Sequence, residues 1–91
     1  MTDKELFFEM IEQIPSIAQL FDKEKSALKV SEFESALLVM SSGEVHMAKF
    51  FVSVWFNNSS RYGFDLIDAV YVIDGAWRKI IINWIADPFY P

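Results

Sequence analysis

Two apolar segments joined by a polar turn dominate the second half of the chain. The first runs from His46 to Phe56 and the second from Leu66 to Ile85, and 11 of the 15 aromatic residues lie between Phe50 and the C-terminus. An aromatic side chain buries roughly 150–250 Å², so this half must supply most of the core. Apolar residues recur at intervals of three and four, which predicts packed helices.

The first segment is predicted to be a helix that ends at Asn57. Its apolar face comprises Met47, Phe50, Phe51, Val54 and Trp55. A strand over the same residues would have no polar face. Ser41 and Glu44 have the spacing of a capping box, and Asn57 tolerates the left-handed conformation that ends many helices. Gly63 then gives the following turn its conformational freedom.

The second segment contains an ambiguous Asp74-Gly75 pair. Asp65 is placed to cap a helix whose apolar face comprises Leu66, Ala69, Val70 and Ile73. Asp-Gly between apolar runs is a strong β-hairpin signal. Helical spacing resumes, however, in Trp77, Ile80, Ile81, Trp84 and Ile85. We interpret Asp74 as the N-cap of a last helix stopped by Pro88, with a hairpin across Val70–Ile82 as the alternative.

The first half is predicted to contain further short helices. Thr2 and Glu5 form a capping box before a helix that Pro15 ends or kinks, and a second helix is expected over Ser16–Glu24. A connector follows, and a box at Ser31–Glu34 opens another helix. The fold class is therefore all-α, with five or six short helices in a single domain over residues 1–91.

The apolar content is high for a chain of this length. Of the 91 residues, 53% are hydrophobic, whereas a chain this short buries only about 60–65% of its unfolded surface. We expect some apolar side chains to form an interface with a protein partner or with a second copy, as a homodimer. The aromatic tail around Phe89 is expected to dock. The candidate interface residues are Trp55, Tyr62, Trp77, Trp84, Phe89 and Tyr90.

Charge and cysteine content exclude several classes of function. The chain has no cysteine and a net charge of −5, which disfavours disulfides, thiolate metal sites and binding to phosphate backbones. The acidic N-terminus does not resemble a signal peptide, and no apolar run approaches the length of a membrane span. We therefore expect a cytoplasmic protein that binds neither membranes nor nucleic acid.

No residues form a recognisable catalytic, cofactor-binding or metal-binding motif. His46 beside Glu44 is a conceivable acid–base pair, but no nucleophile motif accompanies it. Asp65 and Asp74 are explained as helix caps. We predict no cofactor and no metal, and we do not expect an enzyme.

The C-terminal half also carries a composite pattern. An apolar helix ending in Phe56-Asn57 is followed by Gly63, by Phe64-Asp65-Leu66, by Asp74, and by Trp84 with Pro88-Phe89-Tyr90-Pro91. In this pattern the chain resembles a group of small bacterial proteins carried on mobile or cassette-borne DNA. The resemblance covers half of the chain and implies a helical fold, but it implies no activity.

The function predicted from these observations is that of a small helical protein–protein interaction module that associates with itself. One alternative is a small ligand-binding or hydrolytic domain that uses His46. A second alternative is an acidic decoy that occupies a basic nucleic-acid-binding protein.

Overall fold

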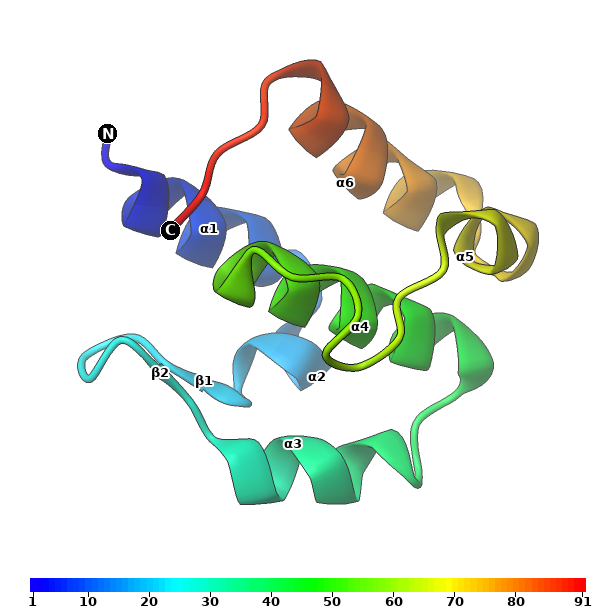
Figure 1. Cartoon of the computed structure of the whole chain (residues 1–91), viewed down its shortest axis with the longest axis horizontal. Coiled ribbons are helices and arrows are strands. Elements are labelled where there is room, and N and C mark those ends of the chain that lie inside the picture. The colour runs from blue at the N-terminus through cyan, green and yellow to red at the C-terminus, as the bar shows by residue number, and fades with distance from the viewer.

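Six helices and one small hairpin make up the computed structural model, which describes residues 1–91 (Figure 1). Two strands pair antiparallel, with Phe21 opposite Leu28, and join the second helix to the third. The predicted all-α class with six short helices is confirmed, and the radius of gyration of 12.1 Å is that of a compact domain of this length. The elements are α1 (Asp3–Ile11), α2 (Pro15–Ala18), β1 (Phe21–Asp22), β2 (Ala27–Leu28), α3 (Val30–Leu37), α4 (Ser42–Phe56), α5 (Leu66–Val72) and α6 (Gly75–Ala86).

Helix α4 lies at the centre of the molecule, with the other helices around it (Figure 1). It begins at the predicted capping box, in which the Ser41 hydroxyl accepts from the Glu44 amide and the Glu44 carboxylate accepts from the Ser41 amide. It ends as predicted at Asn57, which adopts the left-handed conformation with φ of 51°. Local sequence signals therefore define both ends of the central helix.

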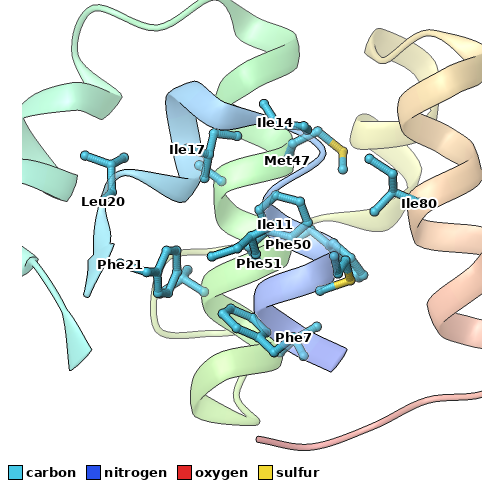
Figure 2. Packing of buried hydrophobic residues seen from close by; sticks show 14 of the residues in the cluster. Phe7, Ile11, Ile14, Ile17, Leu20, Phe21, Met47, Phe50, Phe51 and Ile80 are labelled. Atoms are coloured by element: carbon cyan, nitrogen blue, oxygen red, sulfur yellow. The ribbon is translucent and has the colours of Figure 1, made fainter. Parts of the chain in front are cut away.

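The core forms where α1 and α4 face each other (Figure 2). Phe7 and Ile11 from α1 and Met47 and Phe51 from α4 are completely buried. Ile80 approaches the same cluster from α6 (Figure 2). No polar or charged residue is buried, so the interior is held together by apolar packing.

The segment after α2 differs from its prediction. The expected helix over Ser16–Glu24 is wrong, because α2 ends at Ala18 and a hairpin follows. Asp22 Oδ1 accepts from the Lys25 amide at 2.9 Å, and Ser26 adopts a positive φ of 51°. These local bonds offer the backbone an alternative to the helix.

The predicted capping box at Ser31 is also wrong. Helix α3 begins at Val30, and its N-cap is Lys29, which makes no side-chain cap. The amide of Phe33 bonds to the Lys29 carbonyl at 2.8 Å, so Ser31 already lies inside the first turn. The Glu34 carboxylate instead accepts from the Tyr62 hydroxyl at 3.0 Å.

The ambiguity at Asp74 is resolved as a corner between two helices. Asp74 Oδ1 accepts from the Trp77 amide at 3.0 Å and caps α6, and Asp65 Oδ1 accepts from the Asp68 amide at 3.0 Å and caps α5. Ile73 is buried at the corner. The segment is thus a helix–turn–helix unit, as the spacing predicted, and the hairpin alternative is wrong.

The C-terminal tail docks, as predicted, and runs back towards α1 (Figure 1). Trp84 Nε1 donates to the Phe89 carbonyl at 3.0 Å, and the Tyr90 amide donates to Asp3 Oδ2 at 3.1 Å. These bonds bring the two ends of the chain together.

Candidate functional site

Most of the aromatic residues predicted for an interface pack within the chain itself. Trp55 lies 5.0 Å from Phe7 and 5.8 Å from Phe21, measured between ring centroids. Tyr62 packs against Phe33 at 5.1 Å. The structure therefore places Trp55 against α1 and the hairpin, and Tyr62 against α3.

The remaining candidates lie along α6 and the tail. Trp77 faces α4, because a Cβ atom at Gly43 would lie 3.4 Å from its ring. The Trp84 ring lies 5.7 Å from Phe50 and 5.8 Å from Tyr90. Of the six candidates, only Tyr90 is more than half exposed, at 54%.

The His46 and Glu44 side chains have different surroundings. The Glu44 carboxylate accepts from the Ser16 hydroxyl at 2.9 Å, and this bond, followed by those from Ser41, holds the pKa of Glu44 below its ordinary value. Nδ1 of His46 is buried without a hydrogen-bond partner. Glu44 therefore joins α2 to the start of α4, and its hydrogen bonds go to serines and not to the imidazole.

The acidic side chains of the second half act as caps. Asp65 and Asp74 each accept from a backbone amide three residues ahead. No three His, Cys, Asp or Glu side chains come together in an arrangement suited to a metal ion.

More exposed large apolar side chains lie on α5 and α6 than on any other part of the chain. Tyr71 is 90% exposed and Ile67 is 77% exposed, and between 41% and 58% of the other four residues is exposed. We call this surface the α5–α6 face. It comprises Leu66, Ile67, Val70, Tyr71, Ile82 and Ile85.

A groove runs between the two helices within this face. Its volume is about 170 Å³, and its walls are Leu66 and Val70 on one side and Ile81, Ile82 and Ile85 on the other, with Arg78 beside them. Apolar walls with an exposed aromatic ring next to them are typical of sites where proteins bind one another.

The area of the α5–α6 face is large for so small a protein. With roughly 150–250 Å² for each large side chain, the exposed fractions leave on the order of 500–900 Å² open to solvent. The largest apolar patch on a typical monomer is roughly 300–600 Å² and is often functional. An apolar face as large as the α5–α6 face usually has a binding role.

Two other hollows flank Trp84. One, of about 350 Å³, lies between Phe50, Phe64 and the turn at Asn58, and the other, of about 310 Å³, lies between α1 and α6. Two polar groups of the first hollow already have structural roles, since Asn58 Oδ1 accepts from the amide and the hydroxyl of Ser60 and the Ser53 hydroxyl donates to the Lys49 carbonyl. The polar lining of the second hollow comprises Glu9, Gln13 and Asn83.

Sequence reasoning missed the α5–α6 face. It assigned Leu66, Val70 and Ile85 to the apolar faces of predicted helices. It gave no role to Ile67, Tyr71 or Ile82. The available signal was in α5, where Asp68 is the one charged residue in the seven from Leu66 to Val72. A short helix that is apolar nearly all round has more apolar surface than one neighbour can cover, and only Ala69 of α5 is buried.

No helix of the protein has the length and apolar character needed to cross a bilayer. Comparison of the chain with protein-family models, with curated proteins and with solved structures finds no match. The chemistry of the chain's own surface is therefore what bears on its function.

Proposed function

We propose that the protein is a helical protein–protein interaction module that binds through the α5–α6 face. The observation that carries this proposal is the exposure of Ile67 and Tyr71, at 77% and 90%, beside an apolar groove. Burying a large apolar side chain contributes roughly 1.5–3 kcal/mol, and tyrosine is enriched among the residues that dominate binding energy.

The shape of the face supports the same function. Two short helices that meet at Asp74 form a groove between them, and apolar helix surfaces bind in grooves of this kind. The Asp74 cap and the buried Ile73 hold the corner in place. The face is therefore organised before a partner arrives, which reduces the entropy lost on binding.

The proposal also includes the origin of the protein and the compartment in which it acts. The resemblance of the C-terminal half to proteins of mobile or cassette-borne DNA supports a bacterial origin of that kind. The absence of cysteine suits a reducing compartment such as the cytoplasm.

Site-specific photocrosslinking tests this function. A photoreactive phenylalanine analogue is placed at Tyr71 or, as a control, at Lys25, which is exposed on the β-hairpin turn. We expect adducts of discrete mass from position 71, with this chain or with another protein, and their loss when Ile67→Asp is added. Equal adduct yields from both positions, or adducts unaffected by Ile67→Asp, would contradict the proposal.

A further inference from the structure

We propose that the partner of the α5–α6 face is a second copy of this chain, joined to the first across a two-fold axis. This inference rests on the proposed function and specifies its partner. Three observations carry it, namely the local charge, the area of the face and the size of the groove.

The charge around the face favours contact between identical surfaces. Residues 61–86 contain three basic side chains, Arg61, Arg78 and Lys79, and three acidic ones, so this segment is neutral, while the rest of the chain carries the whole net charge of −5. A two-fold axis brings the same patch of both copies together. Like charges repel, so two copies meet at a lower electrostatic cost through the neutral α5–α6 segment than through the acidic first half of the chain.

The basic side chains near the face are also free to make contacts between copies. The chain's one ion pair joins Lys23 and Glu12, far from α6 in the sequence. Arg78 donates from Nε to the Ile73 carbonyl and lines the end of the groove. The remaining guanidinium nitrogens of Arg78 and the ammonium of Lys79 are thus available to form ion pairs with acidic groups such as Asp65 and Asp68 of the other copy.

The area of the face matches what a dimer requires. A stable interface buries roughly 800 Å² on each partner, and the apolar side chains of the face alone expose an area of the same size, on the order of 500–900 Å². A small partner peptide would leave much of this surface uncovered, whereas an identical face covers it.

The groove also has the capacity for a side chain that the face itself presents. A cavity of roughly 150 Å³ is able to hold a benzene ring, and the groove measures about 170 Å³. Tyr71 follows the groove residue Val70 in α5 and has 90% of its surface exposed. In the dimer, the Tyr71 ring of each copy enters the groove of the other copy, between Val70 and Ile82.

Sedimentation over a concentration series tests the dimer. The variants are Ile67→Asp and Tyr71→Asp, and the matched control is Leu38→Asp, because Leu38 is 86% exposed but lies in the loop after α3. The wild-type chain is expected to reach twice its mass of 10.6 kDa. Both variants on the face should weaken dimerisation by about 30-fold or more, as residues that dominate binding energy do, and the control should not. Circular dichroism establishes that each variant retains its helices.

Three results would overturn the inference. The first is a wild-type chain that stays monomeric at every concentration, and the second is a Leu38→Asp variant that dimerises as weakly as Tyr71→Asp. The third is a mass that grows beyond the dimer, which indicates a head-to-tail contact. If the chain is monomeric but position 71 still forms crosslinks to another protein, the partner is not a second copy, and the proposed function stands. A monomer without such crosslinks would overturn both.

Discussion

Helix α4 and the α5–α6 unit have similar apolar patterns but very different burial. Six of the 15 residues of α4 are buried, whereas α5 and α6 together bury only Ala69, Ile80 and Ile81. The difference comes from position, because α4 has neighbours on several sides and α5 lies at the edge of the molecule (Figure 1). Apolar spacing shows which face of a helix avoids water, but it does not show whether the same chain covers that face.

The two regions do not differ in how well their helices are defined. Ser41 caps α4 and Asp74 caps α6, each through a bond to an amide three residues ahead. Burial, and not local helix formation, therefore distinguishes the core from the α5–α6 face.

The largest expected effect contrasts one buried and one exposed aromatic residue. Phe51→Ala should lower the free energy of unfolding by about 3–5 kcal/mol, because it leaves a cavity in a fully buried site. Tyr71→Ala should change it by no more than about 0.5 kcal/mol, since 90% of Tyr71 is exposed. Urea unfolding at concentrations below self-association measures both values, and equal losses would remove the distinction between the regions.

Cap substitutions should affect both regions alike. Ser41→Ala and Asp74→Ala should each lower the free energy of unfolding by about 1 kcal/mol, because each leaves a first-turn amide without its acceptor. Ser31→Ala is the control, since Ser31 lies inside α3 and makes no cap. Thermal unfolding of the three variants gives the comparison, and a loss for Ser31→Ala as large as the other two would contradict the observed start of α3.

The tail contact should have a slightly smaller effect. Trp84→Phe keeps an aromatic ring next to Phe50 but removes the bond from Nε1 to the Phe89 carbonyl, at an expected cost of about 0.5–1.5 kcal/mol. Hydrogen exchange of the Tyr90 amide, which donates to Asp3, reports on the tail directly. Unchanged exchange in Trp84→Phe would show that the tail does not depend on this bond.

The smallest effect concerns the pH dependence of the core region. The hydrogen bond from Ser16 holds the pKa of Glu44 below its ordinary value of 4.5, so the folded state favours the carboxylate. This stabilisation is present above the unfolded pKa and is lost as the pH falls through the folded pKa. Glu44→Gln should therefore be less stable than wild type near pH 7, with the difference shrinking below pH 4.5.

Glu24→Gln is the matched control for the loss of one carboxylate, because Glu24 is exposed on the hairpin turn. Its unfolding free energy near pH 7 should stay within about 0.5 kcal/mol of the wild-type value. A Glu44→Gln variant with the same pH profile as wild type would show that the bonds from Ser16 and Ser41 do not lower the pKa of Glu44 in solution.

Sequence reasoning predicted the features of the fold that local chemistry determines. The caps at Thr2, Ser41, Asp65 and Asp74 form as their spacing indicates. The β-hairpin was missed because Asp22 and Ser26 form a turn that apolar spacing does not register.

The candidate interface was harder to predict because it depends on packing between distant segments. Trp55 is covered by Phe7 and Phe21, which lie more than 30 positions earlier in the chain. Tyr71, by contrast, has no segment packed over it and is 90% exposed. The sequence-based prediction named Trp55 as an interface residue and did not name Tyr71, and only the folded arrangement shows which of the two is exposed.

Hydroxyl-radical footprinting of Tyr71 over a concentration series tests the role of the α5–α6 face most directly. Tyr90, which is 54% exposed on the tail, serves as the internal reference in the same sample. The modification rate of Tyr71 should fall as the concentration rises while that of Tyr90 stays constant. A Tyr71 that remains the more reactive of the two at every concentration would contradict the assignment of this face as the site where two copies meet.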